Sequence, residues 1–186
     1  MAIINEGTIA KLRRLAASWQ VFNIKMHQYH YNVVGETFDE LHKLFKELYE
    51  EADAHYDAVS ERMRQIGERV VFSCAELAEQ SAVNDENNAN TPQEMLRGTI
   101  DAFAALSSLQ TEIWFESDDQ KDIVTNDLMV QLNKAVEFKN WMVSAQYEVP
   151  LRYVDQCCIC NRKTGKVTSW VPSCEDIFAE DWYRVR

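Results

Sequence analysis

The chain has 186 residues, of which 30 are acidic and 19 are basic, so its formal net charge is −11. This length suggests one domain, or one domain with an appendage. Five glycines and three prolines are too few for a collagen-like or low-complexity protein, and they favour long helices over a turn-rich β fold. The acidity argues against binding to duplex DNA, which depends on clustered Lys and Arg, and it is compatible with attraction of cations.

Nothing in the sequence indicates export or membrane insertion. Residues 1–7 lack the basic segment and the apolar run of a signal peptide, and no stretch reaches 18 consecutive apolar residues. We therefore expect a protein that makes no membrane contact and works in the cytoplasm.

Two long helices are predicted in the first third of the chain. Apolar residues recur at steps of three and four over residues 8–34, the period of an amphipathic helix, and Gly35 ends this helix. Thr37 and Glu40 have the spacing of a capping box, which predicts the start of a second helix there. Gly67 is expected to stop it.

One short helix and two further long helices are predicted after that. Residues 73–81 are expected to form the short helix. Thr-Pro-Gln-Glu at residues 91–94 marks the start of the third long helix, which runs to about Phe115 before Ser-Asp-Asp at residues 117–119 breaks it. The fourth long helix covers residues 122–146. Together these elements predict an all-α four-helix bundle with a short helix in the long connection between the second and third long helices.

The chain changes character after Pro150. β-branched and aromatic residues surround a turn signal, Asn-Arg-Lys-Thr-Gly at residues 161–165, which predicts a small hairpin. We therefore divide the chain into a bundle, residues 1–149, and a Cys-containing extension, residues 150–186.

Four of the five cysteines lie in this extension, and such clustering argues against a disulfide framework. Cys157 and Cys160 form a Cys-x-x-Cys step, which is half of a zinc-binding pattern, and Cys158 or Cys174 could add ligands although no His lies nearby. Three interpretations stay open. They are a zinc site built on Cys157, Cys160 and Cys174, a redox-active pair, and buried thiols.

Four polar residues in the first two helices have the spacing of a metal site. His30 lies one turn before the end of the first helix and His42 lies in the second turn of the next, so a tight turn at Gly35 lets the imidazoles face one another. Asp57 and Glu61 are four residues apart, which places both carboxylates on one helix face. Two imidazoles and two carboxylates suit a divalent iron or zinc ion. Each residue taken singly is also typical of a structural or solvated position.

These four residues cannot bind one ion within one chain. His42 and Asp57 are separated along one helix by roughly 22 Å at the helical rise, whereas a metal–ligand bond measures about 2.0–2.2 Å. A joint site therefore needs the carboxylates of a second copy, packed antiparallel about a two-fold axis, and this arrangement gives two sites per dimer.

Several segments together resemble the signature of the Dps-type mini-ferritins. They are His-Tyr-Asn-Val-Val-Gly at residues 30–35, the twelve-residue step from His30 to His42, Asp-Ala-Val-Ser-Glu-Arg at residues 57–62, and the start of the last long helix at residues 122–128. The resemblance covers roughly residues 8–147. It implies a ferritin-like bundle assembled into a hollow shell of twelve subunits.

The resemblance also implies an activity. Fe(II) would be oxidised by hydrogen peroxide or dioxygen at ferroxidase sites between subunits, and ferric oxide would be stored inside the shell. By position, His30 and His42 of one subunit would bind iron together with Asp57 and Glu61 of its neighbour. Two alternatives are a DNA-protecting nucleoid protein, although residues 1–10 contain no Lys or Arg, and a structural shell that has lost catalysis.

Two residues depart from the pattern of the family. Family members often carry an acidic residue four places after the second His, where this chain has Lys46, which would remove a ligand for a second iron or pair with a site carboxylate. They also commonly carry Trp after the first His, where this chain has Tyr31. Tyr31 is interpreted either as a packing aromatic or as an acceptor of an electron hole near the iron.

An acidic cluster precedes the last long helix. Its carboxylates would cap the helix and favour its dipole, or, as the resemblance implies, line a three-fold pore through which iron enters. The residues of this cluster are Asp118, Asp119, Asp122 and Asp127.

Overall fold

The computed structural model describes residues 4–86, 88–148, 157–160 and 167–170. The chain forms two compact units, Met1–Tyr147 and Glu148–Arg186, which are described separately below. The described part of the chain contains five helices. They are α1 (Glu6–Asn32), α2 (Phe38–Gln65), α3 (Cys74–Gln80), α4 (Pro92–Asp119) and α5 (Ile123–Glu148).

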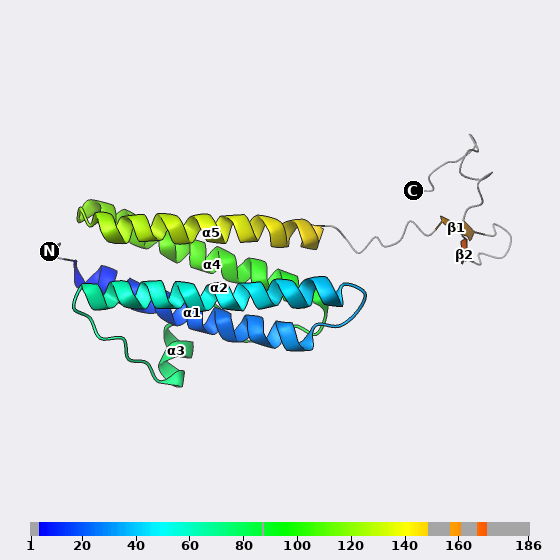
Figure 1. Ribbon diagram of the computed structural model, residues 1–186, viewed down its shortest axis with the longest axis horizontal. Helices are drawn as coiled ribbons and strands as arrows, with labels where there is room; N and C mark the ends of the chain where they lie inside the picture. The colour runs from blue at the N-terminus through cyan, green and yellow to red at the C-terminus, as the bar shows by residue number, and fades with distance from the viewer. Residues whose placement is uncertain (1–3, 87, 149–156, 161–166, 171–186) are drawn as a thin grey trace. The chain divides into compact units, whose positions relative to one another are not determined.

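The four long helices lie along a common axis, and the short helix α3 lies beside α1 (Figure 1). α1 and α2 run antiparallel, as do α4 and α5, and the segment that contains α3 connects the two pairs. The predicted bundle with a short helix between the second and third long helices is thus confirmed. No helix in the described ranges is both long and apolar enough to cross a bilayer.

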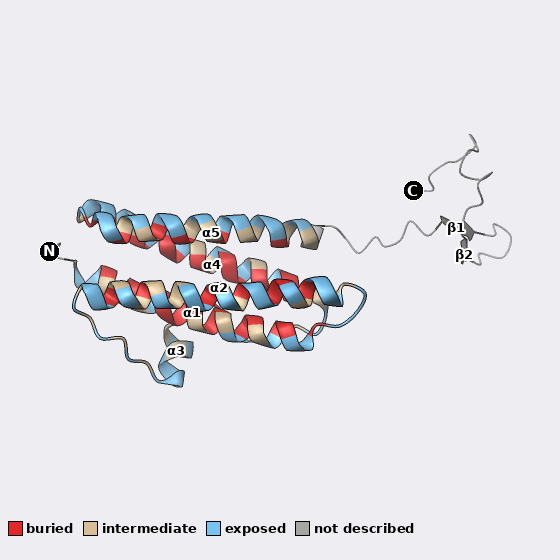
Figure 2. Ribbon diagram, viewed as in Figure 1, coloured by how far each residue is buried: buried red, intermediate tan, exposed pale blue. Residues whose placement is uncertain are grey.

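The core occupies the interior of this bundle. Figure 2 shows buried residues on the sides of the long helices that face one another and exposed residues on the outer sides. The largest fully buried side chains include Trp19 and Phe22 of α1, Phe45 of α2 and Ile113 of α4. Burial of one such side chain contributes about 1.5–3 kcal/mol, so the periodic apolar residues are what holds the helices together.

The glycine stop predicted for the second helix is present, but the one predicted for the first is wrong, because α1 ends at Asn32 with an extended Val33 as its cap and Gly35 lies in the turn beyond. Gly35 has φ +110° and Gly67 has φ +97°, both in the region that favours glycine. After α2 the amide of Gly67 donates to the carbonyl of Arg64 at 3.1 Å and the amide of Glu68 donates to that of Met63 at 2.9 Å. These two bonds form a Schellman motif, which satisfies the last carbonyls of the helix.

The capping box predicted at the start of α2 is wrong. Thr37 is the residue that precedes the helix, but its side chain makes no capping hydrogen bond, and its ψ of 16° departs from the extended backbone typical of a capping residue. Capping boxes are present instead at the starts of α3 and α4, where Ser73 pairs with Glu76 and Thr91 with Glu94.

α4 continues to Asp119 and does not end near Phe115 as predicted. The reason is tertiary: Ser117 is fully buried, and Glu116 accepts a hydrogen bond from Thr8 of α1 at 2.8 Å. Contacts of this kind outweigh the weak helix propensity of Ser and Asp. The helix then closes with Lys121 at φ +57°, a conformation that glycine more commonly supplies.

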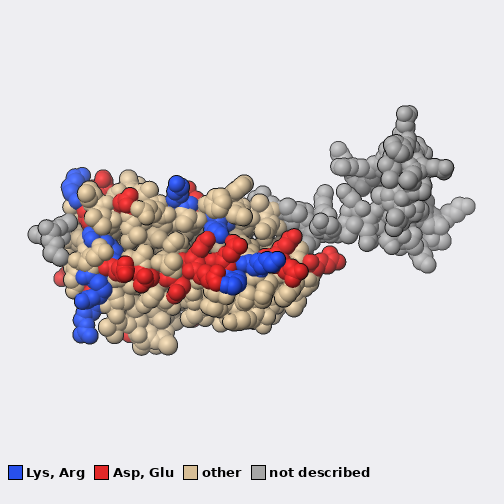
Figure 3. Space-filling model, in the orientation of Figure 1, with Lys and Arg blue, Asp and Glu red and all other residues tan. Residues whose placement is uncertain are grey.

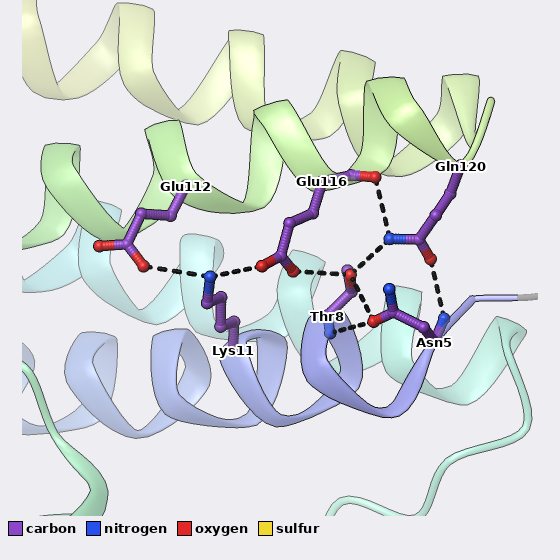
Figure 4. A network of polar contacts seen from close by, with 6 residues as sticks. All are labelled: Asn5, Thr8, Lys11, Glu112, Glu116 and Gln120. Carbon is purple, nitrogen blue, oxygen red and sulfur yellow. Dashed lines mark hydrogen bonds and ion pairs between the residues drawn. The ribbon is translucent and has the colours of Figure 1, made fainter.

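A polar network joins the start of α1 to the end of α4 (Figure 4). Lys11 lies between two carboxylates, with its Nζ at 2.5 Å from Glu116 and 3.2 Å from Glu112. Gln120 donates to the hydroxyl of Thr8 at 2.7 Å and accepts from the backbone amide of Asn5 at 2.8 Å. Thr8 also donates from its hydroxyl to Glu116 and from its backbone amide to the side chain of Asn5, both at 2.8 Å. The network fixes this end of the bundle.

The second unit contains a two-stranded antiparallel hairpin within its described residues. β1 (Cys157–Cys160) pairs with β2 (Val167–Trp170), so that Cys157 lies opposite Trp170 and Cys160 opposite Val167. The hairpin predicted after Pro150 is therefore present.

Candidate metal centre

His30 and His42 bind each other's backbone across the turn between α1 and α2. The Nδ1 of His30 lies 2.7 Å from the carbonyl oxygen of His42, and the Nδ1 of His42 lies 2.8 Å from the carbonyl oxygen of His30. Their rings stack at a centroid distance of 3.7 Å and an angle of 21°. The structure thus brings together the two imidazoles that the sequence predicted to face one another.

This reciprocal bonding decides where the imidazole protons lie. A carbonyl oxygen can only accept, so each Nδ1 must carry the hydrogen. In the neutral ring the lone pair is then on Nε2, which is the atom left free to bind a metal ion. A ring N–H donated to a backbone carbonyl is the usual support of a metal-binding histidine. The pair therefore fits a divalent transition metal.

Aromatic side chains hold the two rings in place. Phe38 stacks on His42 at 4.9 Å, and Tyr49 packs edge to face against His30 at 5.4 Å. Tyr49 also stacks on His27 at 3.7 Å, and burial lowers the pKa of His27. The role of Tyr49 was not predicted from the sequence. Tyr49 lies seven residues, or two helical turns, after His42, and this spacing could have indicated that both side chains lie on the same side of α2.

The histidine pair lies beneath an exposed apolar rim. His30 is 8% exposed, whereas Tyr31, Val34 and Phe38 are 70%, 63% and 41% exposed. Tyr31 contacts the pair through an edge-to-face approach of its ring to His30 at 5.1 Å. Large apolar side chains exposed together in this way are typical of a surface that another protein covers.

Asp57 and Glu61 lie on α2 and are both exposed. Among the residues that the structure describes, no three His, Cys, Asp or Glu side chains come together to hold a metal ion. The two predicted carboxylates are therefore not joined to the histidine pair within one chain, in agreement with the helical distance between them. Within one chain the histidine pair and the two carboxylates are thus separate groups.

Further exposed acidic side chains lie along α2 near Asp57 and Glu61. Figure 3 shows Asp and Glu gathered in a band over α2. The exposed acidic residues of α2 are Asp39, Glu40, Glu47, Glu50, Asp53, Asp57 and Glu61. Such a band raises the local concentration of cations.

Lys46 is also on α2, one turn after His42. Its ammonium forms an ion pair with Glu50 and lies 5.4 Å from the centre of the Tyr49 ring. Lys46 therefore packs against the same aromatic ring as His30. The carboxylate that it pairs with is that of Glu50, four residues further along the helix.

The predicted acidic cluster is divided by the structure. Asp118, Asp119 and Asp127 are exposed, at the end of α4 and in the first turns of α5. Asp122 is only 3% exposed, and both of its oxygens bind Arg62 of α2, at 2.8 and 3.0 Å. A carboxylate so paired is a structural anchor, and the pore role stays a prediction for the three exposed residues.

Asp122 has a perturbed acidity. Burial raises the pKa of its carboxyl, but hydrogen bonds from Thr125 and the ion pair with Arg62 outweigh burial and hold that pKa below its usual value. The amide of Thr125 donates to Asp122 at 3.3 Å, so the same carboxylate also caps α5.

The predicted zinc ligands Cys157, Cys160 and Cys174 lie in the second unit. Cys174 is outside the described residues, and for Cys157 and Cys160 the description is limited to the backbone of β1. The zinc, redox and buried-thiol interpretations therefore remain predictions.

Comparison with protein families finds a match to the model described as Ferritin-like domain over residues 9–150. A second model, described as Thoeris anti-defense 2-like domain, matches residues 125–185. The first covers the helical bundle with its histidine and carboxylate residues. The second covers a third of the chain, mostly the C-terminal extension.

Similar proteins include two whose names refer to protection of DNA. "DNA protection during starvation protein 2" of Bacillus anthracis is 32% identical over 145 residues, which cover 76% of this chain and 97% of that protein. "DNA protection during starvation protein" of Brevibacillus brevis is 30% identical over 137 residues, which cover 74% and 92%.

Solved structures show the same fold. The crystal structure of Dps from Staphylococcus aureus superposes with a TM-score of 0.75 at 26% identity, covering 80% of this chain and all of that one. That of a Dps protein from Bacillus brevis gives 0.73 at 28% identity, covering 76% and 95%. The matched part lies in the bundle, since the family model ends at residue 150.

Proposed function

The chain belongs to the ferritin-like family, in its Dps branch, and from this premise we propose that it is a ferroxidase that oxidises Fe(II) and stores the ferric product. In this role it acts as a homododecameric shell in the cytoplasm and protects the cell from oxidative damage. Iron is the substrate and the stored material. Hydrogen peroxide is the proposed oxidant, with dioxygen as the alternative.

The observation that carries this proposal is the reciprocal bonding of His30 and His42. It fixes both Nδ1 atoms as donors and leaves both Nε2 atoms free to bind iron. Two neutral imidazoles bind Fe(II) well but supply no negative charge. Carboxylates must therefore complete the site, and Asp57 and Glu61 are the pair with the right spacing.

The carboxylates come from a neighbouring subunit in this proposal. The exposed rim of Tyr31, Val34 and Phe38 around the histidines marks the face that the neighbour covers. A two-fold axis at this face gives two equal sites, each made of the histidines of one subunit and the carboxylates of the other. Exclusion of water at such an interface also strengthens the charge interactions within it.

The reaction balances as two Fe(II) ions, one hydrogen peroxide and two protons giving two Fe(III) ions and two waters. Both electrons needed by the peroxide come from iron, so no hydroxyl radical is released. The acidic band over α2 favours the approach of the iron cations.

The double variant His30→Ala with Asp57→Ala tests the site. Stopped-flow absorbance of Fe(III) formation after addition of peroxide should show the rapid phase lost, while light scattering shows an assembly of unchanged mass. Wild-type kinetics in the double variant would refute the site assignment. A stoichiometry far from two irons per peroxide would refute the proposed reaction.

A DNA-protecting role is the alternative, because similar proteins carry that name. The net charge of −11 and the acidic band disfavour it. A gel-shift assay at low and moderate salt should show no retardation of duplex DNA. A structural shell without catalysis is the second alternative, and the same stopped-flow measurement on the wild-type protein distinguishes it.

A further inference from the structure

We propose that Lys46 limits each metal centre to one tightly bound divalent cation, so that the second iron ion of a turnover binds only weakly. This inference rests on the proposed function, because it concerns the same site. In this proposal Lys46 determines how many metal ions the site holds tightly. It also raises the Fe(II) concentration at which the reaction proceeds.

The charges of the residues carry the first step of the argument. Two carboxylates, those of Asp57 and Glu61, balance the charge of one divalent cation, and the imidazoles of His30 and His42 add none. A second divalent cation would leave two positive charges without a balancing ligand. Two-metal sites hold their ions about 3.5–4 Å apart, a separation at which repulsion is severe unless further carboxylates are present.

The position of Lys46 carries the second step. It lies one helical turn after His42, so both project from the same side of α2. Its ammonium packs 5.4 Å from the centre of the Tyr49 ring, and the same ring contacts His30 at 5.4 Å between centroids. The charged group one turn after His42 on α2 is thus a cation, where a second metal ion would need an anion.

The ion pair of Lys46 with Glu50 carries the third step. Glu50 is a carboxylate on the same helix, two turns after His42, and its charge is paired with that of Lys46. Lys46 therefore acts twice, since it repels an additional cation and also neutralises the carboxylate that follows it by one turn on the same side of α2.

Anaerobic titration of the assembled protein with Co(II) counts the bound ions without turnover. Isothermal calorimetry and the visible absorption of Co(II) should give one tight ion per subunit in the wild-type protein. Lys46→Glu should give two, the second bound at least about tenfold more tightly than any second ion in the wild type, because the local charge changes by two units. Lys46→Gln should lie between.

Lys134→Glu is the matched control, because it makes the same charge change at an exposed position of α5. It should leave one tight ion per subunit. In peroxide-driven oxidation, Lys46→Glu should lower the KM for Fe(II) with little change in kcat. This substitution also places two like charges four residues apart, at positions 46 and 50, which is slightly destabilising in an exposed helix. Circular dichroism checks that the fold stays intact.

The outcomes separate this inference from the proposed function. Two equally tight ions in the wild-type protein, or one ion in both the wild type and Lys46→Glu, would overturn the role of Lys46 and leave the ferroxidase proposal standing. Loss of the difference between Lys46→Glu and Lys134→Glu would also overturn it. No Co(II) bound by any of the proteins would instead refute the metal centre itself.

Discussion

Arg62 and Asp122 form an ion pair that joins the last turn of α2 to the residue before α5, and the Nη2 of Arg62 donates to both carboxylate oxygens, at 2.8 and 3.0 Å. The Nε of Arg62 also donates to the hydroxyl of Thr125 at 2.8 Å. Since Asp122 additionally caps α5, one carboxylate ties α2 to the start of α5. The same helix α2 presents Asp57 and Glu61 on its exposed side.

We expect Asp122→Ala to lower the free energy of unfolding by about 3 kcal/mol. Removing one partner of a buried ion pair leaves the other charge buried without compensation, and the cap of α5 is lost as well. Urea unfolding at fixed protein concentration measures the change. Asp118→Ala, at an exposed position four residues earlier, should change it by less than about 0.5 kcal/mol. Equal effects of the two substitutions would contradict the anchor role.

The same pair makes stability depend on pH in the acid range. Because the folded pKa of Asp122 is depressed, its contribution is fully present above the ordinary pKa of about 3.9 and is lost as the pH falls through the lower, folded value. The wild-type protein should therefore lose stability relative to Asp122→Asn only below about pH 4. A difference between the two that stays constant from pH 6 to pH 2 would show that the carboxylate charge is irrelevant.

Gly98 of α4 leaves room for the hydroxyl of Tyr29. A Cβ at position 98 would overlap that oxygen and would lie 3.4 Å from the Cζ of Tyr29, which is 2% exposed. Burial raises the pKa of Tyr29 to about 12, so the hydroxyl keeps its proton at neutral pH. Gly98→Ala should destabilise the protein by about 1–3 kcal/mol, the usual cost of overpacking.

A double-mutant cycle isolates the contact between these two residues. In the background of Tyr29→Phe the hydroxyl is absent, and Gly98→Ala should then become neutral or stabilising by up to about 1 kcal/mol, since Ala is the better helix former. Chemical unfolding of the four proteins gives the coupling energy. If Gly98→Ala destabilised the wild type and Tyr29→Phe equally, the added Cβ would be clashing with a group other than the Tyr29 hydroxyl.

The periodic apolar residues were enough to predict the four long helices, because each of them buries a regular stripe, whereas the short helix α3 buries no side chain and begins at a capping box. The boundaries that differed depend on contacts invisible in a local window. α4 continues past Phe115 because Glu116 and Ser117 find partners and burial within the bundle. The left-handed residue that closes it is Lys121, and no sequence rule points to a lysine there.

The candidate site was predictable in part for a similar reason. The twelve-residue step across a glycine turn predicted that His30 and His42 meet, but the reciprocal carbonyl bonds that fix their tautomer depend on the geometry of that turn. The acidic cluster was read as one group, although Asp122 is drawn inward by Arg62. A buried ion pair between distant segments leaves no local pattern in the sequence.

Mixing two inactive variants tests whether each site is shared between subunits. One variant carries His30→Ala and His42→Ala, and the other carries Asp57→Ala and Glu61→Ala. In a mixed two-fold pair, one site combines both defects and the other combines intact histidines with intact carboxylates. Random co-assembly from equal amounts should therefore restore about a quarter of the wild-type ferroxidase rate, measured by stopped-flow after unfolding and refolding together.

Each variant refolded alone should stay inactive, and so should a mixture of the two made after assembly. An inactive co-assembled mixture of confirmed composition would mean that the histidines and carboxylates of different subunits do not form one site.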